Sequence, residues 1–260
     1  YALGTDGNYN NSSDTYVSWN WKANGQGSSN TDGSINTTYT SANTTAGFSI
    51  CKWSGTGANA TIGHGLGAVP KMIITKSLAT SSWCVYHASL GNTKTIFLES
   101  GGTPYTHIAY YNNTSPTSSV FSVGTDDAVN HSGNDMIAYC FAEVIGFSKF
   151  GSYIGNGSSG NPSFIYTGFK PKFVIVKNTS QSDEWFIHDD KRDGFNDDNE
   201  YLFASVTNAE GSNVNRIRLF SNGFNVATTD KSHNANGNNY IYMAFGQSVV
   251  GSNNVCATAR

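Results

Sequence analysis

Charged residues are scarce in this chain of 260 residues: they make up 13% of it, against about 25% in an ordinary globular protein. Lys and Arg number 15 and Asp and Glu 18, which gives a formal net charge of -3. Such a chain has no basic field to hold nucleic acid or an anionic membrane surface. No apolar run approaches the roughly 20 residues of a membrane-spanning helix. We therefore expect neither a nucleic-acid partner nor membrane insertion.

Cysteine is also scarce, with four residues that lie far apart: Cys51, Cys84, Cys140 and Cys256. This number is too small for a disulfide-dense scaffold, and no CxxC pair suggests a metal knuckle. The first three lie in apolar, strand-like runs, where a thiol acts as a small hydrophobic side chain. We expect them to be reduced and buried.

Glycine (28 residues) and many Asn, Ser and Thr residues supply the polarity that charge does not. These residue types have low helix propensity, because short polar side chains compete for backbone hydrogen bonds and glycine loses the most backbone freedom. The 14 Tyr, 15 Phe and 5 Trp residues, with Val, Ile and Thr, fill a pleated surface well. The composition predicts an all-β fold.

The chain contains an internal repeat with a spacing of about a hundred residues, which is the size of a whole domain. Three segments of the first half, 53–57 (WSGTG), 67–76 (GAVPKMIITK) and 83–87 (WCVYH), have counterparts in the second. The counterparts are 153–157 (YIGNG), 168–177 (GFKPKFVIVK) and 185–189 (WFIHD), and 133–142 matches 237–246 in the same way. We predict two tandem, duplicated β-sandwich units of jelly-roll-like form over 47–147 and 148–247, followed by a tail over 248–260.

Two proline residues mark the central strands of these units. Pro70 and Pro171 each precede a run that is apolar on both faces, and a proline without an N–H belongs at the first residue of a strand. In residues 133–142, large side chains alternate with small ones, which favours close packing of two sheets. Lys76 and Lys177 end the two proline-initiated runs, and we expect both to be solvated.

Residues 1–46 differ from the repeats. Val17, Trp19 and Trp21 alternate with polar residues, which predicts one amphipathic strand with an aromatic face. That strand either closes a domain upstream or pairs with a repeat. Residues 23–45 are mostly Gly, Asn, Ser and Thr, and this composition predicts a linker or a loosely held loop.

Four stretches resemble, in order and spacing, tail-fibre and related virion proteins of marine tailed phages. They are residues 16–23, 61–67, 137–143 and 147–153, and the chain end over 257–260 is similar as well. The resemblance covers nearly the whole chain and concerns a C-terminal module to which no function is assigned in those proteins.

The resemblance implies a structural or receptor-engaging virion component that is assembled in the host cytoplasm. It implies partners among other virion proteins and further copies of the chain, for example in a trimer. It supplies no catalytic residues and no cofactor, and we expect a protein that is not an enzyme. The alternative is a free carbohydrate-binding protein, or a non-catalytic module of a carbohydrate-active enzyme.

An acidic segment is the one candidate metal site. Asp189, Asp193 and Glu200 stand at positions one, five and twelve of a calcium loop. Position three is Lys191, a cation where a ligand oxygen is needed, and no helices are expected on either side. We therefore predict no bound metal.

Sugar binding is the functional hypothesis that the residues themselves favour most. Exposed aromatic rings stack on the apolar faces of sugars, and polar side chains bond the hydroxyl groups. Tyr105, His107, Tyr110 and Tyr111 lie in a polar stretch without a close match in the second unit, and an extra loop is where function is often added. Packing of the tyrosines against strands is the competing explanation.

Overall fold

The computed structural model describes residues 3–79, 82–192, 200–212 and 215–248. Regular structure in these ranges is almost entirely β-strand, which confirms the all-β prediction. The helices of the described part have one turn each: α1 (Gly7–Asn10), α2 (Ile108–Tyr111) and α3 (Asp127–Asn130). No helix in these ranges is long and apolar enough to cross a membrane.

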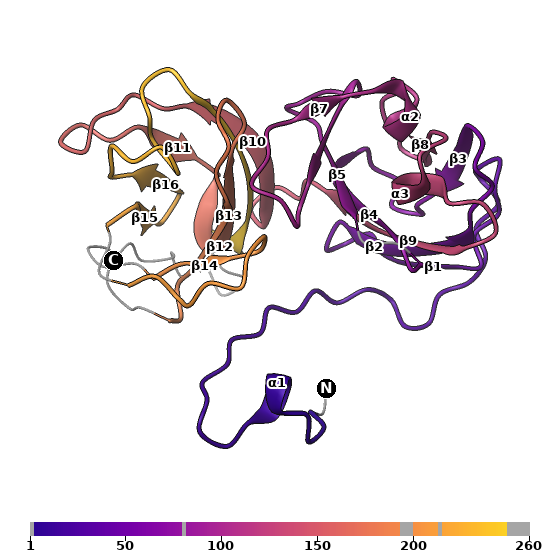
Figure 1. The fold of residues 1–260 in the computed structure, drawn as a ribbon, viewed down its shortest axis with the longest axis horizontal. Helices are drawn as coiled ribbons and strands as arrows, with labels where there is room; N and C mark the ends of the chain where they lie inside the picture. Colours follow the sequence, from indigo (N-terminus) through magenta and orange to yellow (C-terminus); the bar gives the residue numbers. More distant parts are fainter. Residues whose placement is uncertain (1–2, 80–81, 193–199, 213–214, 249–260) are drawn as a thin grey trace.

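The strands up to residue 142 form the first of two lobes, which we call lobe 1 (Figure 1). Its large sheet has the order β1 (Tyr39–Asn43), β2 (Phe48–Ser54), β9 (Asp135–Ala142), β4 (Pro70–Ser77), β5 (Trp83–His87), β6 (Lys94–Phe97) and β7 (Tyr105–Thr106). A second layer pairs β3 (Ala60–Gly63) with β8 (Val120–Val123).

The strands from residue 148 onward form lobe 2, which stands beside lobe 1 in Figure 1. Its large sheet has the order β10 (Ser148–Ile154), β17 (Asn239–Ser248), β12 (Phe169–Asn178), β13 (Trp185–Asp189) and β14 (Leu202–Phe203). Its second layer has the order β11 (Phe164–Tyr166), β16 (Gly223–Val226) and β15 (Ile217–Phe220).

The strand order is the same in the two lobes. The order β2-β9-β4-β5-β6 in lobe 1 matches β10-β17-β12-β13-β14 in lobe 2, and β3–β8 matches β11–β16. The register shifts directly after Pro70 in one lobe and directly after Pro171 in the other. This topology agrees with the expected repeat, while the duplication itself and the unit boundaries stay predictions.

The side chains of β4 and β9 explain why these strands are apolar on both faces. Ile73, Ala138 and Cys140 face the core of lobe 1, which lies between its two layers. Met72 and Phe141 face the opposite way, into a second core that lobe 2 shares. The alternation of large and small residues in β9 thus separates a tight internal core from a bulky contact between lobes.

We call this shared core the seam. It is built from those faces of the two large sheets that point toward the other lobe. Its residues include Phe48, Phe141, Phe173, Ile175 and Phe245. A polar bond also crosses it: the Lys177 Nζ donates to the Gly101 carbonyl oxygen of lobe 1 at 2.9 Å. Within lobe 2, the same Nζ donates to the Asp183 carbonyl oxygen at 2.6 Å. Lys177 is fully buried, so its expected solvation was wrong, because a second lobe covers the strand end.

Residues 3–23 form an extended arm that runs below both lobes in Figure 1. The predicted strand over residues 17–21 was wrong, since these residues pair with no sheet, although Val17, Trp19 and Trp21 are half-buried and alternate with exposed residues as expected. The prediction of a linker or loosely held loop over residues 23–45 was wrong for its last part. Residues 39–43 form β1, which pairs with β2 and satisfies the backbone groups of this polar segment.

Candidate functional site

The structure brings three of the four predicted sugar-binding residues together at one edge of lobe 1. Tyr105 lies in β7, the outer strand of the large sheet, and His107 caps α2 through its Nδ1, which accepts from the Ala109 N–H at 3.1 Å. The rings of Tyr105 and His107 are nearly parallel, 10° apart, with centroids 5.9 Å apart. Tyr110 meets these rings edge-on, at 6.1 Å and 6.2 Å.

We call Tyr105, His107 and Tyr110 the aromatic cluster. Tyr105 is 52% exposed, and the neighbouring Ile108 is 57% exposed. Tyr110 is half-buried and packs edge-on against Phe97 at 5.8 Å. Its partial burial raises the pKa of the Tyr110 hydroxyl to about 12, so this group is a neutral donor and acceptor at physiological pH.

Tyr111, the fourth predicted residue, does not belong to the cluster. It is 2% exposed and packs edge-on against Tyr86 at 5.6 Å, inside the core of lobe 1. Burial raises the pKa of Tyr111 well above its usual value. Successive residues of a helix point about 100° apart, so Tyr110 faces outward and Tyr111 inward; its placement in a ligand site was wrong.

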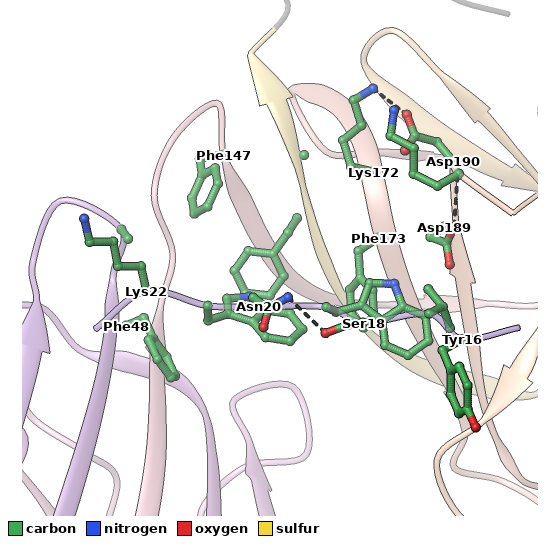
Figure 2. A pocket seen from close by; sticks show the side chains of 17 residues that line it. Tyr16, Ser18, Asn20, Lys22, Phe48, Phe147, Lys172, Phe173, Asp189 and Asp190 are labelled. Carbon is green, nitrogen blue, oxygen red and sulfur yellow. Dashed lines mark hydrogen bonds and ion pairs between the residues drawn. The ribbon is translucent and has the colours of Figure 1, made fainter. Parts of the chain in front are cut away.

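A groove lies where the arm crosses the seam (Figure 2). Its volume is about 680 Å³, and its apolar lining comes from the arm and both lobes. The edge-on contacts of Trp21 with Phe173 at 5.3 Å and with Phe245 at 5.4 Å hold the arm in place. Sequence analysis missed this groove, because the residues that line it meet only when the arm, β12 and β17 come together.

The polar side chains of the groove bond mainly to one another (Figure 2). Lys172 forms an ion pair with Asp190, and the Asn20 amide donates to the Ser18 hydroxyl at 3.0 Å. Asp189, at the far wall, accepts from the Arg192 Nε at 2.7 Å. The chemistry of the groove is therefore mainly packing, and both of its carboxylates, Asp189 and Asp190, are held in ion pairs.

The ion pair between Asp189 and Arg192 also argues against calcium binding at Asp189. Asp189 is buried and also accepts from the backbone N–H groups of Lys191 and Arg192, so its carboxylate has few free lone pairs left for a cation. These bonds and the Arg192 charge keep the pKa of Asp189 below its usual value despite its burial. Asp193 lies outside the described residues. Within those residues, no three His, Cys, Asp or Glu side chains form a possible metal site.

Lobe 2 holds a buried histidine pair that sequence analysis did not single out. The Nε2 atoms of His188 and His233 are 2.9 Å apart, and the Ser232 hydroxyl bonds the His233 Nδ1 at 2.7 Å. Burial lowers the pKa of His188 to about 3 and that of His233 well below its usual value. A serine beside a histidine resembles a nucleophile with its base. However, Ser232, His188 and His233 are each at most 1% exposed, so they cannot contact a substrate.

Three cysteines have the role that the sequence predicted. Cys51, Cys84 and Cys140 are free thiols in the core of lobe 1. Burial raises the pKa of Cys140 well above its usual value, so this thiol is protonated and unreactive. Cys256 lies outside the described residues.

The chain belongs to a family described as a domain of unknown function (DUF7483), whose profile matches residues 1–248. A search of curated proteins and a search of solved structures found no match. The family thus covers the arm and both lobes together and assigns no activity to them.

Proposed function

We propose that this chain is a non-enzymatic virion component, in a tail fibre or related appendage, that attaches to host-surface glycans through the aromatic cluster. One observation carries the glycan contact: Tyr105 and His107 present nearly parallel rings at the open edge of lobe 1, in a segment with no counterpart strand among the described residues of lobe 2.

The arrangement suits a sugar for two physical reasons. A ring face offers apolar area without a charge that must be desolvated, so it fits the C–H face of a hexose. The hydroxyl groups of Tyr105 and Tyr110 can donate to or accept from the sugar hydroxyls. Neither reason requires a bond-breaking step.

A glycan array tests the attachment. The wild type and the Tyr105→Ala variant are applied at equal concentration. On the glycans that the wild type binds, we expect the signal of the variant to be at least tenfold lower. Tyr9→Ala is the matched control, because Tyr9 is a 67% exposed tyrosine of α1, in the arm. An array with no binding, or equal binding by all three proteins, contradicts the proposal.

The virion part of the proposal is supported by the sequence resemblance and by the low charge of the chain. Mass spectrometry of purified phage particles tests it directly. Peptides of this chain at the copy number of a structural protein support the proposal, and their absence from intact particles favours a free carbohydrate-binding protein.

A further inference from the structure

Lobe 1 and lobe 2 differ at one corresponding edge. In lobe 1, residues 33–35 lie along β3: the Ile35 N–H donates to the Thr61 carbonyl oxygen at 3.1 Å, and Ile35 forms a parallel bridge with Ile62. Ser34 adds two more bonds, with the Thr61 hydroxyl at 2.8 Å and the Thr61 N–H at 2.9 Å. An extended segment thus covers this edge of the sandwich.

The same edge is open in lobe 2. β11 corresponds to β3, since Ile165 stands opposite Phe224 as Ile62 stands opposite Phe121. Within the described residues β11 is the outer strand of its sheet, next to β16 (Figure 1). Only residues 143–147 lie between β9 and β10, so the described chain has no segment at this point that corresponds to residues 33–35.

The side chains at this edge also differ in type between the two lobes. The positions of Thr61 and Gly63 in lobe 1 are those of Phe164 and Tyr166 in lobe 2. Gly63 has no space for a side chain, because the Asn30 side chain of the covering segment lies against it. Phe164 and Tyr166 are instead 49% and 65% exposed. An outer strand with exposed aromatics and no charged residue is one that proteins normally protect or pair.

The backbone of β11 is free to accept a partner. The Val226 N–H donates to the Ser163 carbonyl oxygen, and the Thr167 N–H donates to that of Asn222. Because peptide groups alternate along a strand, those of Phe164 and Tyr166 point away from β16, toward the open edge.

We propose that β11 pairs with β11 of a second copy of this chain, antiparallel across a two-fold axis at Ile165. This register places Phe164 of each copy opposite Tyr166 of the other, as the hydrogen-bonded pairs that an antiparallel ladder requires. The strand is self-complementary: its sequence, aromatic–Ile–aromatic, gives two aromatic cross-strand pairs and no facing charges. The two outer sheets become one continuous sheet, with an isologous interface.

This inference does not rest on glycan binding, which uses the opposite lobe. The strand is short, so the interface lies at the small end of the range for specific complexes, and we expect a dissociation constant on the order of 10–100 μM. On an assembled particle, many copies held close together would make such a weak contact effective.

Analytical ultracentrifugation of the full chain over a concentration series tests the pairing. We expect the wild type to shift from 27.8 kDa toward twice that mass. The double variant Phe164→Lys/Tyr166→Lys places like charges opposite each other in both pairs and is expected to weaken association at least tenfold. Phe164→Glu/Tyr166→Lys removes the same rings but sets opposite charges face to face, so it is expected to associate at least tenfold more tightly than the lysine pair.

Leu78→Lys is the matched control, a 57% exposed apolar residue of lobe 1, and it is expected to leave the dimer unchanged. Circular dichroism and thermal unfolding confirm that both double variants are folded. A wild type that stays monomeric at a few hundred micromolar overturns the proposal, whatever else its exposed aromatics bind. So does a dimer that the lysine pair leaves intact, or equal weakening by both double variants.

Discussion

Trp185 of β13 donates its indole N–H to the main-chain oxygen of Phe97 in β6, at 2.9 Å, and this bond joins lobe 2 to lobe 1. Trp185 is 1% exposed, so the bond is shielded from water. Together with the bonds of Lys177 to Gly101 and of His87 to Tyr242, it makes the seam a polar as well as an apolar contact.

Trp185→Phe is expected to lower the free energy of unfolding by about 1–3 kcal/mol, because the buried acceptor loses its donor and the smaller ring leaves a gap. Urea denaturation followed by circular dichroism measures this. Trp83→Phe is the control, since Trp83 is half-buried and stacks on Tyr139 at 6.3 Å. If both variants cost the same, the bond across the seam contributes nothing of its own.

Stability is expected to fall between pH 6.5 and pH 4. Burial lowers the pKa of His87 to about 4, so in this range the His87 imidazole is protonated in the unfolded chain and still neutral in the folded chain. The contribution of neutral His87 is complete above pH 6.5, and we expect about 2 kcal/mol of it to be lost by pH 5. His188, with a pKa of about 3, acts in the same direction.

Urea denaturation at pH 7 and pH 5 measures this loss. His87→Gln keeps an N–H for the Tyr242 carbonyl oxygen and cannot titrate, so it is expected to lose less stability than the wild type over the same interval. His107→Gln changes an exposed histidine and should keep the wild-type pH dependence. A His87→Gln variant that is as acid-sensitive as the wild type contradicts the assignment.

The arm is expected to detach when its indole rings are removed. In Trp19→Ala/Trp21→Ala, the edge-on contacts with Phe173 and Phe245 disappear, each worth about 0.5–1.5 kcal/mol beyond buried area. Limited trypsin digestion should cleave after Lys22 at least tenfold faster than in the wild type, while both lobes stay intact. Tyr16→Ala, a change at a 48% exposed ring, serves as the control, and an unchanged cleavage rate in the double variant argues against anchoring by the tryptophans.

Two buried asparagines hold corresponding turns, and we expect them to be equally costly to replace. The Asn130 Oδ1 accepts from the Thr56 N–H at 3.0 Å, and the Asn234 Oδ1 accepts from the Asn156 N–H at 2.9 Å. Asn130→Ala and Asn234→Ala should each cost about 2–3 kcal/mol, since several buried groups lose their partners. Thermal unfolding measures both, with the exposed Asn36 replaced by Ala as the control. A large cost in one lobe and none in the other would mean that the two turns are not equivalent.

Local chemistry predicted much of this fold. Pro70 marked the first residue of β4, while Pro171 lies two residues inside β12, where the register shifts. The alternation in residues 133–142 anticipated the two cores on either side of β9. These features depend on residues close together in the chain, where the period of the side chains decides which face is buried.

Long-range contacts were beyond the sequence. The sequence alone places Lys177 at a solvated strand end, because its partner, the Gly101 carbonyl oxygen, belongs to lobe 1. The alternation in the arm suggests a strand, but its two indole rings are buried by packing against the seam and not by strand pairing. In the candidate site, sequence reasoning named the segment that carries the aromatic cluster but could not separate Tyr110 from Tyr111. That distinction depends on the rotation of a single helical turn, which no pattern of four residues defines.

The proposed role of the aromatic cluster is to hold a glycan without cleaving it. The most direct measurement is a titration followed through the histidine ring protons by NMR, with a glycan that binds on the array. We expect the His107 signals to shift until the site is saturated and those of the buried His64 to stay in place. The glycan should be recovered at its original length. Unmoved His107 signals at saturation, or shortened glycan products, would contradict it.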